Sequence, residues 1–396
     1  MSIDMTVLAN DGMHPDGVRL LKEAGFRVDT EKKDPEQLLK VIGKYAALTV
    51  RSQTEVPEPL IEAGVENDGK LKVIARQGIG VDKIDVKAAY KYGVAVQISP
   101  SGNTIAAAEL TIGLMIAVGR GIFPAYEAIL RGEFLGENGL QLQGTTLGLF
   151  GCGRIGTEVA RRAHAFNMNV IGCDPKPVMP PEITSVSLEY LLKTSNFISI
   201  HVSGNPLILG EEQFKLMEQK PYIFNVARGG CIDEQALYTA CITGKIAGAA
   251  LDVHANEPKR GGQFKSILTP LPNVLLTPHI GASTEQAQRE TSMETARGII
   301  DYLVHGNFTN MIMVGDAIKP EETEFDNLFI TNSDVPGAFW RIDEVLSQHG
   351  INIRDIKSNS IEGTPYVLTV YRVHPKPPIK VLRELRALDV VEYARL

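Results

Sequence analysis

The 396-residue sequence predicts an α/β protein with two parallel-sheet domains followed by a smaller βαββαβ domain. Short apolar strands alternate with amphipathic helices over residues 1–98, and a second series of the same kind follows residue 119. Residues 325–396 then start a different order of strands and helices. Strands that alternate with helices favour a parallel sheet, and a chain of this length is expected to form two or three domains.

In the N-terminal part, the elements follow from periodicity and from helix-ending glycines. Strands are expected at 5–10, 45–52, 71–76 and 93–99, and amphipathic helices at 15–25 and 35–43. The apolar stretch at 105–118 contains Glu109 and is too short to span a bilayer, so it is expected to be a helix buried between domains.

The second series contains six apolar runs with helical segments between the first five, which suits a doubly wound dinucleotide-binding domain. The six runs are 145–151, 169–174, 197–202, 222–227, 246–253 and 273–279. A long amphipathic helix begins at a Ser/Thr cap after His279 and is expected to return the chain to the N-terminal domain. The predicted domains are therefore 1–98 with 285–315 and, inserted between them, 99–284.

Residues 309–325 lack periodicity and contain a proline followed by acidic residues, which predicts a linker. Beyond it, residues 325–396 give strand, helix, two strands about EGTP, helix and final strand. This βαββαβ order is ferredoxin-like and predicts a third domain.

Composition excludes several classes of protein. The formal net charge of −7 argues against general binding of nucleic acid or anionic membranes. The four cysteines form no CxxC pair and do not cluster with histidines, so we expect buried thiols in a reducing cytoplasm and no metal site. The N-terminus shows no basic segment followed by an apolar run, so no secretory signal is expected.

A glycine-rich turn, GCGRIG at 151–156, follows a strand and opens a helix. Its glycines permit a tight turn, close approach of a pyrophosphate and helix–strand packing, and the helix N-terminus favours an anion. Asp174 ends the next strand, where a carboxylate accepts hydrogen bonds from ribose hydroxyls and repels a 2′-phosphate. The turn therefore predicts NAD rather than NADP, against the alternative of a structural turn with a surface aspartate.

Three polar side chains follow later strands of this domain. Arg228 ends a buried run in NVARGG, where it suits a substrate carboxylate or, alternatively, an interdomain salt bridge. Glu257 follows Asp252 in ALDVHANEP; it is either a solvated loop charge or the partner of a histidine. His279, between Pro278 and a glycine in LTPHIGAST, is either a polar residue at a strand end or a proton-transfer group whose pKa a carboxylate would raise.

Together, GCGRIG, NVARGGCIDEQAL, AGAALDVHANEP and TPHIGAST resemble the successive signatures of the D-isomer-specific 2-hydroxyacid dehydrogenases. The resemblance covers most of residues 1–310 and implies a flavodoxin-like substrate domain with an inserted Rossmann domain that binds NAD. The cleft between these domains is expected to hold both ligands and to close on binding. The resemblance implies that Arg228 binds the substrate carboxylate, that Glu257 pairs with the histidine and that His279 is the general acid/base.

Two departures from the family pattern stand beside the cofactor region. His254 replaces the aromatic residue that usually follows LDV, and HVSGNPLILG at 201–210 lacks the usual HVPLT form. Neither removes an inferred catalytic group. The cofactor contacts that the resemblance implies are Gly151, Gly153, Arg154, Ile155, Gly156, Asp174, Val202, Ala227, Arg228, Asp252, His279 and Gly281.

The N-terminal domain offers a set of substrate contacts: Arg51, Ser52, Arg76, Gly78 and Asn103. Singly they are surface arginines, a surface serine, a turn glycine and a helix N-cap; as a set they could bind a doubly charged group. With GASTEQAQ, they resemble the branch of the family that oxidises 3-phosphoglycerate to 3-phosphohydroxypyruvate, the entry step of serine synthesis. The alternatives are a glyoxylate or hydroxypyruvate reductase and a non-catalytic NAD-sensing protein.

The C-terminal NSDVPGAFWRIDEVLSQHGINI resembles an ACT domain with its Asp-x-Pro-Gly turn. Paired ACT domains bind L-serine in feedback-inhibited members of the branch. Here Asn332 and Asp334 stand at the positions before the turn, a departure that leaves serine inhibition open, while Asn352 matches a further serine contact. The expected partners are thus a small-molecule substrate, an amino-acid effector and further copies of the chain in a homodimer or homotetramer.

Overall fold

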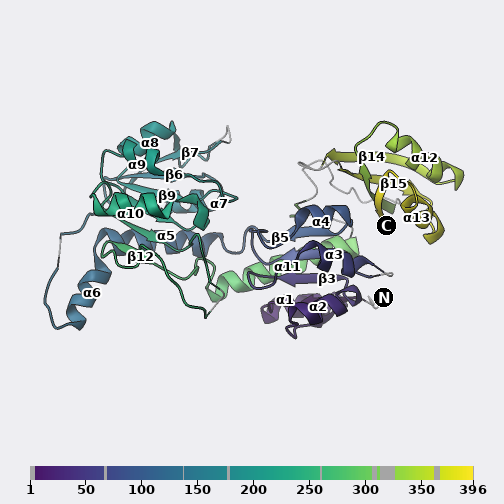
Figure 1. Cartoon of the computed structure of the whole chain (residues 1–396), viewed down its shortest axis with the longest axis horizontal. Coiled ribbons are helices and arrows are strands. Elements are labelled where there is room, and N and C mark those ends of the chain that lie inside the picture. The colour runs from purple at the N-terminus through teal and green to yellow at the C-terminus, as the bar shows by residue number, and fades with distance from the viewer. Residues whose placement is uncertain are drawn as a thin grey trace. The chain divides into compact units, whose positions relative to one another are not determined.

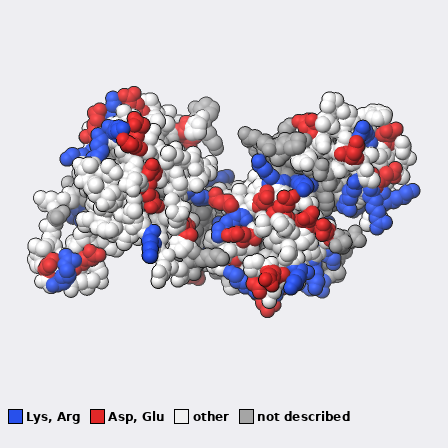
Figure 2. Space-filling model, in the orientation of Figure 1, with Lys and Arg blue, Asp and Glu red and all other residues white. Residues whose placement is uncertain are grey.

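The computed structural model describes residues 5–66, 69–136, 138–175, 179–258, 261–305, 310–312, 326–360 and 366–395. The chain divides into two compact units, one of Met1–Gly102 with Arg289–Leu396 and one of Asn103–Gln288 (Figure 1). Acidic and basic side chains are interspersed on the face seen in Figure 2, so no large field of a single sign covers that face.

The N-terminal residues form a five-stranded parallel sheet in the order β2-β1-β3-β4-β5, which is the flavodoxin-like order. The fold class predicted for this domain is confirmed. Its strands are β1 Thr6–Ala9, β2 Arg27–Asp29, β3 Ala47–Val50, β4 Val73–Arg76 and β5 Ala95–Ile98. Its helices are α1 Pro15–Glu23, α2 Pro35–Val41, η1 Ile42–Lys44, α3 Glu58–Val65 and α4 Val86–Lys91.

The long helix α11, Glu285–His305, joins the core of this sheet, as predicted from the sequence. Thr284 caps it, because the Thr284 Oγ1 accepts a hydrogen bond of 3.1 Å from the Ala287 amide. Further along, Ala296, Ile299 and Tyr302 are buried with Val7 and other side chains of the sheet.

The second unit holds a seven-stranded parallel sheet in the order β12-β11-β10-β9-β6-β7-β8, so the predicted doubly wound topology is confirmed. Its strands are β6 Thr146–Phe150, β7 Asn169–Cys173, β8 Thr184–Ser185, β9 Phe197–Ile200, β10 Tyr222–Asn225, β11 Gly248–Leu251 and β12 Val274–Leu276. The seventh, β8, was not predicted, because two exposed residues carry no apolar periodicity.

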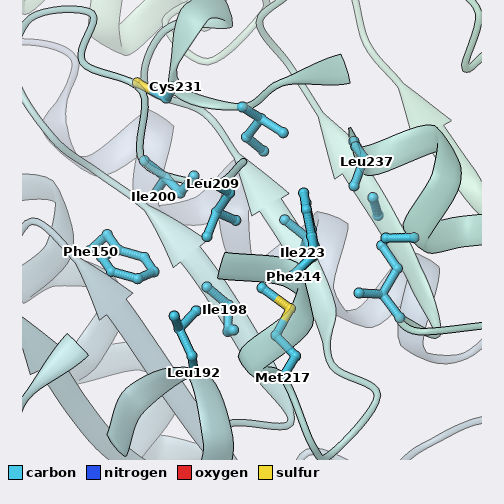
Figure 3. Close-up of a cluster of buried hydrophobic side chains, with 14 of the residues drawn as sticks. Phe150, Leu192, Ile198, Ile200, Leu209, Phe214, Met217, Ile223, Cys231 and Leu237 are labelled. Carbon is cyan, nitrogen blue, oxygen red and sulfur yellow. The ribbon is translucent and has the colours of Figure 1, made fainter. Parts of the chain in front are cut away.

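Helices cover both faces of this sheet. On one face, α8 Leu188–Thr194, α9 Glu211–Leu216 and α10 Glu234–Ile242 bury the cluster shown in Figure 3, which includes Phe150, Ile198 and Leu237. On the other, α5 Thr104–Gly119 and α7 Arg154–Ala165 bury Met115 and Val159. Strands covered on both faces are apolar along their whole length, which explains the continuous hydrophobic runs in the sequence.

Two further segments complete this unit, α6 Ile122–Leu130 and η2 Gly229–Cys231. No single described helix is long and apolar enough to cross a membrane. The consecutive helices α5 and α6, bent by 61° at their junction, reach that length and composition only together.

The C-terminal residues fold into a four-stranded antiparallel sheet in the order β14-β15-β13-β16. The elements are β13 Asp326–Ser333, α12 Ala338–Gln348, β14 Asn352–Ser360, β15 Tyr366–His374, α13 Ile379–Arg386 and β16 Val391–Arg395. The ferredoxin-like prediction is confirmed. The linker predicted at 309–325 lies outside the described residues except for 310–312, where Met311 forms an antiparallel bridge with Gln97, which is a residue of β5.

Candidate active site

His279 and Glu257 form a hydrogen-bonded pair at the carboxyl edge of the seven-stranded sheet. His279 follows β12 and Glu257 follows β11, and these two strands are parallel neighbours. The His279 Nδ1 lies 2.8 Å from the Glu257 Oε2. The side chains are 49% and 36% exposed, so the pair is reachable from solvent. The Nε2 edge of the imidazole is therefore the edge that can exchange a proton with a ligand.

The Asp252 carboxylate anchors the turn that carries His279. Asp252 is 1% exposed, and its Oδ1 accepts hydrogen bonds from the Ile280 amide at 2.8 Å and the Thr277 hydroxyl at 2.6 Å. Its Oδ2 accepts a hydrogen bond of 2.8 Å from the Gly281 amide. These bonds hold His279 at a φ of 53°, a left-handed conformation that a histidine adopts only where its surroundings impose it.

The charges around His279 raise its pKa. The hydrogen bond that His279 donates to Glu257 raises the pKa most, and burial opposes this rise. The charges of Glu257 and Asp252 raise the pKa further, while that of Arg228 lowers it. For Glu257, burial raises the pKa, but the bond to His279 and the charges nearby outweigh burial, so the pKa lies below its usual value. The pair thus stabilises the imidazolium that forms when neutral His279 accepts a proton, which makes the histidine a stronger base.

Arg228 stands on a rigid loop after β10. The Asn225 side chain makes two hydrogen bonds to this loop. Its Nδ2 donates to the Arg228 carbonyl at 2.8 Å, and its Oδ1 accepts from the Ala227 amide at 3.0 Å. The next residue, Gly229, has no room for a side chain: a Cβ there would lie 2.0 Å from the carbonyl carbon of His254. The loops of Arg228 and Glu257 are therefore packed together, which brings the three predicted catalytic residues to one edge of the sheet.

The glycine-rich turn between β6 and α7 fits a dinucleotide. Gly151 has a φ of 86°, and a Cβ there would lie 2.6 Å from the His201 backbone. A Cβ on Gly156 would lie 2.3 Å from the Gly151 carbonyl oxygen, so this glycine allows the helix to pack on the strand. Gly153, in contrast, has nothing within 4 Å of a Cβ position and opens the N-terminus of α7 with no side-chain cap. An exposed amide end of a helix suits a pyrophosphate.

The remaining predicted cofactor residues also lie at this edge. Arg154 and Ile155 open α7, and Asp174 follows β7, where its Oδ2 accepts a hydrogen bond of 2.8 Å from the Cys152 amide. Val202 and Ala227 follow β9 and β10. A Cβ on Gly281 would lie 3.2 Å from the Asp252 Oδ2, so a larger residue would crowd the anchor of the His279 turn.

The predicted substrate residues divide between the two units. Arg51 and Ser52 follow β3, and Arg76 ends β4, where its Nε donates to the Gly80 carbonyl at 2.7 Å and its Nη1 to the Gln77 carbonyl at 2.8 Å. Gly78 has a φ of 135° in the same turn. Asn103 is in the other unit, at the N-cap of α5. It occupies the predicted N-cap position but makes no capping hydrogen bond, and its Oδ1 is buried without a hydrogen-bond partner among the described residues.

The predicted effector residues are divided between the two ends of the ACT-like sheet and differ in exposure. Asn332 pairs with Val367 at the start of β15, with Asp334 two residues further along the chain, whereas Asn352 pairs with His374 at the end of β15. Asn332 is 1% exposed; its Nδ2 donates to the Ser333 carbonyl at 3.1 Å and its Oδ1 accepts from the Thr369 hydroxyl at 3.0 Å. Asp334 and Asn352 are exposed. Asp334 and Asn352 are thus open to an effector in a single copy, whereas the Asn332 amide is engaged within the sheet.

Comparison with known proteins gives the family. Residues 112–281 match the D-isomer specific 2-hydroxyacid dehydrogenase, NAD binding domain, and residues 327–390 match the ACT domain. A hydroxypyruvate reductase of Thermotoga maritima is 40% identical over 304 residues, which are 75% of this chain and 98% of that protein. This chain belongs to the D-isomer specific 2-hydroxyacid dehydrogenases.

Other members of the family are similar over the same part of this dehydrogenase. The D-3-phosphoglycerate dehydrogenase of Methanocaldococcus jannaschii is 43% identical over 305 residues, which are 74% of this chain and 56% of that protein. The chain thus spans between about half and two thirds of the length of the first phosphoglycerate dehydrogenases that it matches. A glyoxylate reductase structure from Paecilomyes thermophila has a TM-score of 0.70 at 30% identity, covering 79% of this chain and 99% of that chain.

Sequence reasoning did not single out Asp11, which shapes the Arg51 loop of this dehydrogenase. Its Oδ2 accepts hydrogen bonds from the amides of Arg51 at 2.7 Å, Gln53 at 3.2 Å and Thr54 at 3.0 Å, and its Oδ1 accepts one of 2.6 Å from the Thr54 hydroxyl. Burial raises the pKa of the Asp11 carboxyl, but these bonds outweigh it and hold the pKa below its usual value. The sequence feature that could have identified Asp11 is its position just after β1, because ligand-binding groups follow the carboxyl ends of parallel strands.

No group of three or more His, Cys, Asp or Glu side chains with the arrangement of a metal site occurs in the described part of the dehydrogenase.

Proposed function

We propose that this dehydrogenase oxidises 3-phospho-D-glycerate to 3-phosphohydroxypyruvate with NAD, the first step of L-serine biosynthesis. The observation that carries the reaction type is the His279–Glu257 pair, 2.8 Å apart, beside the Arg228 loop. The substrate is supported by the similarity to phosphoglycerate dehydrogenases and by the cations that follow β3 and β4.

Each residue of the pair has a distinct part in the proposed mechanism. NAD, when bound, supplies the acceptor for the hydride that leaves C2 of the substrate. His279 removes the proton of the C2 hydroxyl through Nε2, and Glu257 stabilises the imidazolium that results. Arg228 binds the carboxylate and thereby orients C2.

We propose that Arg51, Ser52, Arg76, Gly78 and Asn103 bind the phosphate end of the substrate. Two guanidinium groups match the charge of a phosphate, and each can donate two parallel hydrogen bonds to a pair of phosphate oxygens. The turn that Arg76 bridges is rigid, because the arginine bonds to carbonyls on either side of Gly78. An unphosphorylated acid would offer these guanidinium groups no phosphate to bind.

A steady-state assay of NADH formation tests the proposal. The enzyme is expected to turn over 3-phosphoglycerate, and His279→Ala is expected to lower kcat by about 10²–10⁴-fold, the usual contribution of a general base, while NADH still binds. Turnover by His279→Ala at close to the wild-type rate, with intact NADH binding, would refute the assignment of His279.

A reductase acting on hydroxypyruvate or glyoxylate is the second candidate, favoured by the hydroxypyruvate reductase that this chain covers almost completely. The two candidates are separated by kcat/KM for phosphorylated and unphosphorylated substrates, each repeated with Arg51→Ala. A loss confined to the phosphorylated substrate supports phosphoglycerate; an equal or absent effect supports the reductase. If no substrate gives a change in NADH absorbance, the third candidate, a non-catalytic NAD-sensing protein, gains support.

The ACT domain supports an amino-acid effector, for which we propose contacts from Asn332, Asp334 and Asn352. Assays with and without L-serine, together with calorimetry with L-serine and other amino acids, test this proposal. Inhibition or heat release that is lost in Asp334→Ala supports it, whereas an absence of both assigns the domain to association alone.

We also propose a homodimer or homotetramer. Several large apolar side chains on α6 and after it are exposed: Ile122, Phe123, Tyr126, Ile129, Leu130, Phe134 and Leu135. Exposed apolar clusters of this size mark association surfaces.

The domain boundaries 1–98 with 285–315, 99–284 and 325–396 remain a proposal, as does a cytoplasmic location. The free state of Cys152, Cys173, Cys231 and Cys241 supports a reducing compartment.

A further inference from the structure

His254 is a buried histidine directly beside the His279–Glu257 pair. It follows β11, is 8% exposed, and its ring lies 4.5 Å from that of Phe264, centroid to centroid. An apolar aromatic side chain such as phenylalanine at this position would need no hydrogen-bond partner. An imidazole in the same place has two ring nitrogens to satisfy.

One ring nitrogen of His254 reaches the turn that carries His279. Its Nε2 lies 2.9 Å from the Thr277 carbonyl oxygen. Because a carbonyl oxygen only accepts, the proton is on Nε2 and the imidazole is the donor. The same carbonyl accepts a hydrogen bond of 3.0 Å from the His279 amide. A single carbonyl thus links the His254 ring to the backbone of His279.

The backbone of His254 reaches the other member of the pair. Its amide donates to the Glu257 Oε1 at 3.2 Å, while the Oε2 of the same carboxylate binds His279. Gly229, in the loop of Arg228, packs against the His254 carbonyl so closely that no side chain would fit there. His254 therefore contacts the segments that carry all three predicted catalytic residues.

We infer that His254 is a positioning residue for the acid–base pair: its ring N–H fixes the Thr277 carbonyl and thereby sets the left-handed turn that aims His279 at Glu257. A phenylalanine would fill the same space and keep the contact with Phe264, but it could not donate this hydrogen bond. Without the bond, the turn around Pro278 gains freedom, and the distance from Nδ1 to Oε2 is no longer held.

Four ionisable groups near His279 influence its pKa. Glu257 and Asp252 favour its protonated form and Arg228 opposes it, while His254 acts through Glu257, whose ionised form it favours. A loosened turn weakens the contact with Glu257, which is the largest contribution. The pKa of His279 therefore falls toward its ordinary value when the His254 donor is removed.

The second ring nitrogen supports a fixed tautomer. The His254 Nδ1 is buried and has no hydrogen-bond partner among the described residues. The ring nitrogen that donates is therefore Nε2, and its acceptor is the Thr277 carbonyl.

The test compares His254→Phe and His254→Gln, the second of which keeps an N–H near the position of Nε2. Phe264→Leu is the matched control, because it removes the ring beside His254 and leaves the hydrogen bond. The first measurement is an NMR titration of the His279 ring in the ligand-free full-length protein. The second is the pH profile of kcat and KM. Melting temperatures identify variants that fail to fold, and His254→Met replaces His254→Phe if the latter does not fold.

In His254→Phe, we expect the pKa of His279 to fall and kcat to drop about tenfold with KM nearly unchanged, as for other groups that orient a catalytic residue. His254→Gln and Phe264→Leu are expected to retain both properties. The inference is overturned if His254→Phe keeps the His279 pKa and kcat, or if all three variants lower kcat alike without moving that pKa.

The kinetic arm rests on the proposed dehydrogenase function, whereas the titration does not. An inactive wild-type protein would refute that function and leave the titration to decide the role of His254.

Discussion

At the scale of single residues, the acid–base pair joins two side chains whose pKa values are shifted in opposite directions. The pKa of His279 is raised, chiefly by its bond to Glu257, and the pKa of Glu257 is lowered despite its burial. A group whose pKa rises on folding stabilises the fold fully below its unfolded value, 6.5 for histidine, and loses that contribution as the pH rises through the folded value. Glu257 contributes above its usual 4.5 and loses its contribution as the pH falls through the lowered value.

The same shifts predict the pH dependence of catalysis. Oxidation requires neutral His279, so kcat/KM for 3-phosphoglycerate should rise with pH through the His279 pKa. Glu257→Gln removes the carboxylate, so this rise should move to lower pH while the maximum kcat falls by up to about 10⁴-fold, as when the histidine of a catalytic triad loses its carboxylate partner. The measurement is the pH–rate profile of both proteins. A rise at an unchanged pH in Glu257→Gln would show that Glu257 does not set the pKa of the base.

At the scale of elements, buried carboxylates shape two of the loops that follow strands. Asp252 fixes the turn after β12, and Asp11 fixes residues 51–54 after β3. In both places an oxygen accepts from backbone amides, which leaves the loop's own side chains to meet a ligand.

Asp11→Asn tests this role in the Arg51 loop. The amide would place donors against backbone N–H groups, so the loop should loosen at a cost of about 1–3 kcal/mol in the free energy of unfolding. We expect kcat/KM to fall for 3-phosphoglycerate and much less for unphosphorylated acids. The control is Glu31→Gln, an exposed carboxylate in the loop after β2, which should change neither property. An equal fall in kcat/KM for phosphorylated and unphosphorylated substrates would show that Asp11 has no specific role in phosphate binding.

The N-terminus of α7 offers a second prediction for an element. Gly153→Ala places a methyl group in open space, at a negative φ that alanine adopts, so the fold should persist. The methyl group would stand where a pyrophosphate approaches, so NADH affinity should fall at least about tenfold, or about 1.4 kcal/mol.

The matched control is Gly113→Ala in α5, which also has nothing within 4 Å of its Cβ and should stabilise the helix by about 1 kcal/mol. Calorimetric titration with NADH and denaturation curves measure both effects. Unchanged NADH affinity in Gly153→Ala would mean that the cofactor does not approach this turn.

At the scale of the whole molecule, the sequence predicted what local patterns encode. Apolar runs with glycine, arginine or acidic residues at their ends predicted the main strands of the Rossmann sheet and the edge that holds His279, and the fold of each domain is confirmed. The contacts of Asp11, Asp252 and His254 could not be predicted. They depend on backbone amides and carbonyls of loops far away in the sequence, whose directions only the folded chain sets.

Association is the remaining property of the whole molecule that the surface predicts. The cluster on α6 and directly after it includes Leu130 at 67% and Phe134 at 97% exposed, unusual values for large apolar side chains in a monomer. We expect the protein to be at least dimeric and the double variant Leu130→Asp/Phe134→Asp to dissociate, because two charges on the surface of each copy would be buried in the interface without partners.

Light scattering coupled to size-exclusion chromatography measures the mass of both proteins. Val335→Asp/Trp340→Asp, at exposed apolar positions of the ACT domain, is the matched comparison. Dissociation by the first variant alone assigns the dimer to α6, and dissociation by the second alone assigns it to the ACT domain. A tetramer that falls to dimers in either variant requires both surfaces. If the wild-type protein is a monomer at micromolar concentrations, the α6 cluster is not an association surface between copies of the chain.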